Sequence, residues 1–248
     1  MSFSRLALRL ATVKALTDAT LAGSRVRDSE IGPLEDLAEN EAAPVIIVYT
    51  DDEETNISRR DLSTHDGWQS LVIELAVTTR MKHADGWEVP QTSEGLELTL
   101  DLIERQVITT LTGGSGSWAV VWRNLVRECG KRNSRRGASA RDGTRYAGRQ
   151  IVLEIQLPKE PSAVTVDGPL WSAFFAAVDA ESDLSPISST LRGIAVGDTG
   201  LTDFNALRAA FGMTEGEGEA LLLRPIAASI APPVVELNAN QHDFDPLP

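Results

Sequence analysis

The chain has 248 residues and a formal net charge of −13, an acidic balance that excludes a protein coating nucleic acid with its whole surface. Hydrophobic residues make up 42% of it, enough for a sizeable core in one large domain or in a domain with an appendage. No apolar run approaches membrane-spanning length and no signal peptide is recognisable, so we expect a soluble, intracellular product.

The first third of the chain predicts one helix and the central strands. Residues 3–21 repeat apolar side chains at helical spacing, and residues 25–29 fit a short strand. Residues 44–50 predict a central strand covered on both faces, because apolar β-favouring side chains follow one another without interruption. The acidic run at 51–54 then opens a long charged loop that we expect to reach residue 67. Residues 68–81 alternate as a strand with one buried face.

The middle of the chain predicts two helices, a basic arm and a closing strand. Residues 94–111 carry an apolar stripe at helical spacing and end at a glycine pair. Residues 118–130 predict a second helix, with Cys129 on its buried side as an inert thiol. We expect residues 131–149 to be irregular and residues 151–157 to form the closing strand.

The last third differs in character, and we place a domain boundary before it. Residues 1–160 are expected to form the main domain, and residues 161–248 a smaller extension with short helices at 171–178 and 203–211 and an acidic, Pro-rich tail. The predicted fold class is α+β, with an antiparallel-dominated sheet of about four strands packed by helices.

Basic charge is concentrated in one segment of this acidic chain. Between residues 122 and 149 there are nine basic side chains and only two acidic ones. This basic arm, residues 123–149, predicts contact with a phosphate backbone or with an acidic surface of a partner or neighbouring subunit. The alternative is a solvated loop. Tyr146 is the only aromatic residue between 123 and 149, which argues against base stacking.

No motif in the sequence predicts catalysis, a cofactor or a metal site. The Gly-Ser run at 113–117 lacks the lysine of a phosphate-binding loop and follows a helix. The carboxylates at 51–54 lack the spaced ligands of a calcium loop, which favours a solvated loop or a subunit contact. His65, His83 and His242 are far apart in the sequence, and together with the single cysteine they do not have the spacing of zinc ligands. An enzyme with dispersed carboxylates stays open as an alternative.

The order of features resembles the tail terminator (tail-completion) proteins of long-tailed bacteriophages over about residues 1–158. The residues that carry this resemblance are 5–10 (RLALRL), 22–26 (AGSRV), 44–51 (PVIIVYTD), 71–77 (LVIELAV), 96–104 (LELTLDLIE) and 151–155 (IVLEI). The region after Pro161 departs from compact members of that family.

The resemblance implies a non-enzymatic virion protein made in the host bacterial cytoplasm. Such proteins form a homo-hexameric ring at the tail–neck junction, which ends polymerisation of the tail tube protein and joins the tail to the head-neck connector protein. Genomic DNA passes through the lumen without specific binding. The alternatives are another neck or head-completion protein, or a nucleic-acid-binding adaptor that uses residues 123–149. We expect subunit or partner contacts at Asp51, Asp52, Arg59, Arg60, Asp61, Arg123, Arg127, Lys131, Arg132, Arg135, Arg136, Arg141 and Arg145.

Overall fold

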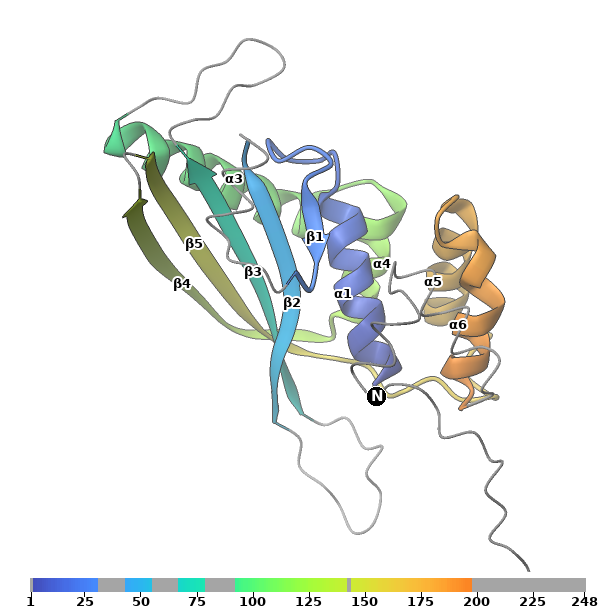
Figure 1. The fold of residues 1–248 in the computed structure, drawn as a ribbon. Helices are drawn as coiled ribbons and strands as arrows, with labels where there is room; N and C mark the ends of the chain where they lie inside the picture. Colours follow the sequence, from blue (N-terminus) through green and yellow to red (C-terminus); the bar gives the residue numbers. More distant parts are fainter. Residues whose placement is uncertain (1, 31–42, 55–66, 79–91, 142–143, 198–248) are drawn as a thin grey trace, which may run out of the picture. The chain divides into compact units, whose positions relative to one another are not determined.

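The computed structural model describes residues 2–30, 43–54, 67–78, 92–141 and 144–197. These residues form five α-helices and a five-stranded mixed sheet, which confirms a mixed α+β fold (Figure 1). The elements in chain order are α1 Phe3–Leu16, β1 Val26–Asp28, β2 Val45–Glu54, β3 Trp68–Thr78, α3 Ser93–Gly113, α4 Ser117–Leu125, β4 Glu128–Arg141, β5 Thr144–Gln156, α5 Pro169–Ala180, a 3-10 turn Ser185–Ile187 and α6 Ser188–Ala195.

The sheet has the strand order β1-β2-β3-β5-β4, with β1 parallel to β2 and every other pair antiparallel. It therefore contains one strand more than the four or so that we expect from the sequence. The additional strand is β4, which pairs along its length with β5 and forms one edge of the sheet. The opposite edge is formed by β1, which is only three residues long.

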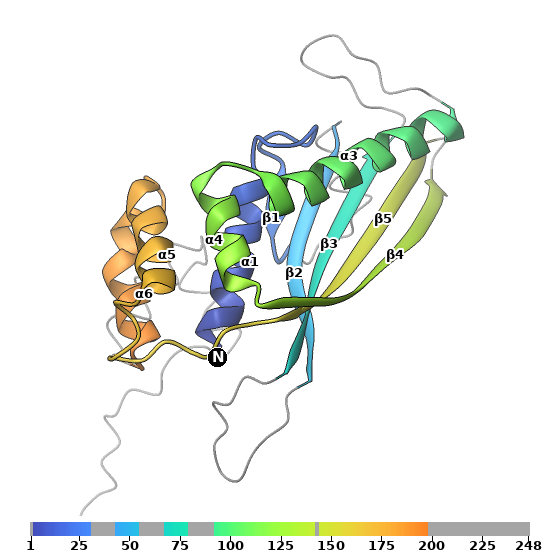
Figure 2. The same cartoon turned by 180° about the vertical axis from the view of Figure 1, so that it is seen from behind.

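Helix α3 lies on one face of the sheet, where it packs against the long strands β3 and β5, and α4 packs against α1 and α3 (Figure 2). Ile73 of β3 and Ile151 of β5 are register partners, and both are fully buried. Leu100 and Ile103 of α3 are likewise inaccessible to solvent. Each such side chain contributes about 1.5–3 kcal/mol through the burial of apolar surface, so this contact forms the main core.

A carboxylate from beyond β5 caps the first helix. Glu160 accepts hydrogen bonds from the Ser2 hydroxyl at 2.5 Å, the Phe3 amide at 2.8 Å and the Ser4 amide at 3.1 Å. An anion is favoured there because the free amides give the start of a helix positive character. These bonds connect the segment that follows the sheet to the beginning of the chain.

Helix α5 packs against α4, and its aromatic side chains join those of α1 and α4 in one cluster. Phe174 is fully buried, with ring centroids 5.7 Å from Phe3, 6.0 Å from Trp118 and 5.2 Å from Phe175. Residues up to 199 group into one compact unit. The boundary that we place at residue 160 therefore falls inside this unit, and the helix predicted at 203–211 and the acidic tail lie outside the described residues.

Two predicted helices are shorter than the sequence pattern suggests. Helix α1 ends at Leu16 instead of residue 21, because the backbone turns at Asp18, which has a φ of 57°. Helix α4 ends at Leu125, since Val126 is extended, and not at residue 130. Cys129 consequently lies on β4 with an exposed side chain, so its predicted position on a buried helix face is wrong.

Two segments predicted as irregular are strands. The segment 131–149, expected to be irregular, forms most of β4 and the beginning of β5. The β4 part of this segment shows no apolar–polar alternation, because its described side chains are exposed on both faces of the strand. Backbone pairing with β5, and not burial of one face, keeps it in the sheet. The acidic run at 51–54 belongs to β2 and does not open a loop, because Glu53 and Glu54 pair with Gln69 and Trp68 of β3.

Candidate functional site

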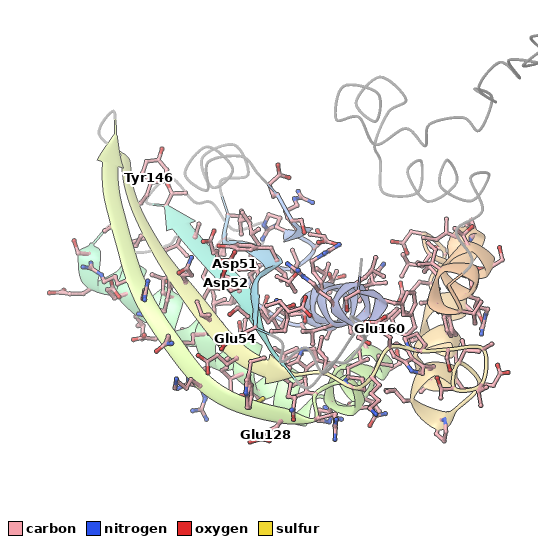
Figure 3. All side chains as sticks on the ribbon, turned by 90° about the horizontal axis from the view of Figure 1, so that it is seen from below. Asp51, Asp52, Glu54, Glu128, Tyr146 and Glu160 are labelled. Carbon is pink, nitrogen blue, oxygen red and sulfur yellow. The ribbon has the colours of Figure 1, made fainter. Side chains whose placement is uncertain are left out.

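The edge strand β4 exposes a row of basic side chains. Every side chain from Arg127 to Ala138 is exposed, and Figure 3 shows β4 as a long, curved strand at the outside of the sheet. The side chains of three of the arginines predicted as contact residues take part in no hydrogen bond or ion pair within the described part of the chain. They are Arg127, Arg132 and Arg135.

Two arginines of the hairpin are bound to α3 instead. Arg149 of β5, whose side chain is 14% exposed, donates Nη1 to Asp101 at 2.5 Å and to Glu104 at 2.8 Å. Its Nη2 lies 3.1 Å from Glu97, which also pairs with Arg136 of β4. Burial alone lowers the pKa of Arg149, but the hydrogen bonds to Asp101 and Glu104 outweigh that effect and raise the pKa above its ordinary value. The arginine is therefore a fixed cation.

Of this arginine–carboxylate cluster only Arg136 is among our predicted contact residues, although the sequence contains a signal for the other members. Glu97, Asp101 and Glu104 recur at four and three residues and so share one face of α3. Arg149 occupies the same face of β5 as Ile151, which the strand period places toward the helix. A charged residue that continues a row of buried side chains on one face of a strand therefore predicts an oppositely charged partner inside the protein.

Arg123 and Lys131 also have partners within the chain. Arg123 donates Nη1 to the Gly114 carbonyl at 2.9 Å, so it stabilises the carboxyl end of α3. The Lys131 ammonium lies 3.8 Å from Glu154 and its side chain is 76% exposed, so this ion pair contributes little. Arg59, Arg60 and Asp61 lie outside the described residues, as do the side chains of Arg141 and Arg145.

The distal part of β2 presents the acidic counterpart. Asp51, Asp52 and Glu54 are exposed, and their carboxylates form no ion pair within the described residues (Figure 3). Arg5 of α1 supports the backbone behind them, since its Nη2 donates to the carbonyls of Thr50 at 3.0 Å and of Asp51 at 2.9 Å. The acidic end is thereby fixed to the domain.

A β-bulge between Thr50 and Glu53 interrupts the pairing with β3 at this point. The buried Gln69 fills the break, donating its side-chain amide to the Asp52 carbonyl at 2.9 Å. Among the residues that the structure describes, no group of three or more His, Cys, Asp or Glu side chains is placed to hold a metal ion. The three histidines lie outside those residues.

A polar cluster crosses the face of the sheet opposite α3. The Tyr49 hydroxyl donates to Glu74 at 2.9 Å, and the Gln150 side-chain amide donates to the same carboxylate oxygen at 2.8 Å. Burial, together with the hydrogen bond to Glu74, raises the pKa of Tyr49 from 10.0 to about 12. The cluster joins β2, β3 and β5.

We expect Tyr49 to remain protonated at a pH where an ordinary tyrosine has ionised. At a pH of about 11, with folding verified by circular dichroism, Tyr49→Phe should leave the phenolate absorbance unchanged. Because the unfolded chain ionises first, Tyr49 stabilises the fold below pH 10, and this contribution is lost as the pH rises to about 12. A drop in phenolate absorbance on substitution, equal to one tyrosine, would contradict the cluster geometry.

No helix in the described part of the chain is long and apolar enough to cross a membrane. In comparisons with known proteins, no family model matches the chain, and no curated protein matches it. The site is therefore interpreted from its own geometry: a basic sheet edge with three arginines and an acidic strand end with three carboxylates, none of which forms an ion pair with another residue that the structure describes.

Proposed function

We propose that this protein is a structural assembly component of a bacteriophage virion, which forms a homo-hexameric ring in the manner of a tail terminator. The observation that carries the proposal is the exposed edge of β4, a strand of fourteen residues on which no strand of the described residues pairs from outside. Long uncovered edges are interaction surfaces, because their backbone groups and side chains are available to another chain. In this role the ring would end the tail tube and join it to the head-neck connector at the tail–neck junction.

The fold supports this role in its order of elements. The helix over residues 5–10, the strands at 44–51 and 71–77 and the helix at 96–104, which carry the resemblance, all lie in regular elements of one domain. In that domain β5 pairs with both β3 and β4 and so joins the edge strand to the core. An edge that belongs to the sheet of the main domain suits repeated contacts between identical subunits.

The main rival is a nucleic-acid-binding adaptor that would use residues 123–149. Two observations disfavour it. Arg149 and Arg136 are neutralised by carboxylates of α3, and Arg123 binds backbone carbonyls. Fewer cations of the arm are therefore free for phosphate than the sequence suggests. A protein surface with a few well-placed carboxylates fits the remaining arginines better. Another neck or head-completion protein would use the same edge.

Light scattering on the purified full-length chain tests the proposal. We expect the mass to rise with concentration from the 26.8 kDa of one chain to six times that value. A protein that stays monomeric up to its solubility limit, alone and with tail tubes present, would overturn the ring. Tight DNA binding that weakens by about one log unit per phosphate contact for each decade of salt would favour the adaptor instead.

A further inference from the structure

We infer that the acidic end of β2 of one copy binds the basic edge of β4 of the next copy. The acidic end is Asp51, Asp52 and Glu54, and the basic edge is Arg127, Arg132 and Arg135. This inference rests on the proposed ring, since it names the two surfaces through which neighbouring subunits would meet. The occupant of the β4 edge is thus a second copy of this chain.

The two surfaces lie on opposite edges of the sheet. The strand order places β4 at one edge and β1 and β2 at the other. β1 pairs with β2 only at residues 46–48, so β2 has no outer neighbour beyond Val48 in the described part of the chain. The acidic end therefore emerges at the edge that faces away from β4.

Charge selects which edges can meet. Within the described residues, three arginine side chains without an ion-pair partner stand on one edge and three carboxylates without one on the other. Two β4 edges brought together would set arginines against arginines, and such like-charge contacts cost several kcal/mol. An isologous dimer through β4 is therefore disfavoured, whereas contact of β4 with the acidic end of β2 pairs opposite charges.

Contact between two different surfaces of one subunit is heterologous. Heterologous contacts repeat from copy to copy, and they close into a ring when the rotation between copies allows it. A rotation about an axis along the strands keeps the strand directions, so β4 of one copy would run antiparallel to β2 of its neighbour. The geometry of one sheet thus leads to a head-to-tail arrangement.

Both surfaces are held in place before any contact forms. Arg5 and Gln69 fix the backbone of residues 50–52, so the acidic end loses little freedom on binding. On the other edge, Arg136 and Arg149 hold the hairpin to α3. Arg132 lines a pocket beside Asp101 and Glu104 without an ion pair to them, and Arg135, the register partner of Gln150, lies on the opposite face of the strand. The hairpin is therefore fixed by Arg136 and Arg149, whereas the side chains of Arg132 and Arg135 form no ion pair within the described residues.

Charge reversal on each surface tests the inference by light scattering on full-length variants. We expect Arg135→Glu alone, and Asp52→Arg alone, to raise the concentration needed for half-assembly by about tenfold or more, because like charges then meet. The matched control is Lys159→Glu, an exposed charge reversal outside both surfaces, which should assemble like the unchanged protein. An equal mixture of the two single variants should assemble again, since alternating copies restore opposite charges at every contact.

The outcomes separate the two proposals. If the unchanged protein never assembles, the proposed ring fails. If it assembles and the reversed variants assemble equally well, the ring stands and this pairing of surfaces is wrong. Loss of assembly without recovery in the mixture, with both variants folded by circular dichroism, also overturns the pairing.

Discussion

Replacement of Phe174 by alanine should lower the free energy of unfolding by about 3–5 kcal/mol, as for other fully buried phenylalanines. The ring is inaccessible to solvent and stands among the rings of Phe3, Trp118, Trp171 and Phe175. Its removal leaves a cavity between α1, α4 and α5 that rigid neighbours fill only in part. Urea unfolding followed by tryptophan fluorescence measures the loss.

Val164→Ala is the matched control, since Val164 is 90% exposed and should change the unfolding free energy by less than about 0.5 kcal/mol. A chain shortened after residue 160 gives a second measurement. It loses α5, so Phe3 and Trp118 become exposed, and it should be less stable than the full chain by several kcal/mol, on the order of more than one buried aromatic side chain. Equal stability of the two chains would support a main domain that ends near residue 160, as the sequence predicts.

Substitution of Arg149 by methionine should cost about 2–3 kcal/mol, somewhat less than the 3–5 kcal/mol of a fully buried broken ion pair. The Arg149 side chain is 14% exposed and Glu104 is 16% exposed, so the substitution leaves carboxylates without their cation in a partly dry site. Because the cluster holds the hairpin to α3, proteolysis within β4 should accelerate as well. Chemical denaturation and limited digestion together measure the effect.

Arg135→Met is the comparison for this variant, because Arg135 is exposed and has no partner in the described residues. Its effect on stability should stay within about 0.5 kcal/mol. The double variant Arg149→Met with Glu104→Gln should lose less unfolding free energy than the two single variants lose in sum, since both partners of the ion pair are removed together. Similar losses for Arg149→Met and Arg135→Met would show that the cluster does not support the fold.

The core of this fold is predictable from the sequence because apolar residues recur regularly in its helices and strands. The stripe of α3 and the alternation of β3 identify those elements, since burial of one face dictates the residue pattern. β4 carries no such pattern: its side chains up to Ala138 are exposed on both faces, and it is a strand only because β5 pairs with it. Local propensity cannot show a pairing that depends on tertiary context.

The sequence predicts which residues of the candidate site are charged, but not which of them form ion pairs within the fold and which stay exposed. Sequence composition shows that residues 122–149 are basic, and it cannot show that Arg136 and Arg149 face carboxylates of α3. The acidic run is equally visible, whereas its place at the edge opposite β4 depends on the strand order. Strand order depends on pairing between segments that are far apart in the sequence, and the positions of charged residues do not reveal that pairing.

Electron microscopy of the purified full-length chain at concentrations where light scattering detects association tests the central claim most directly. We expect closed rings with sixfold symmetry and an open centre, in which neighbouring copies meet through the edge of β4. Two-fold dimers, open filaments or isolated monomers under all of these conditions, also in the presence of tail tubes, would contradict the ring.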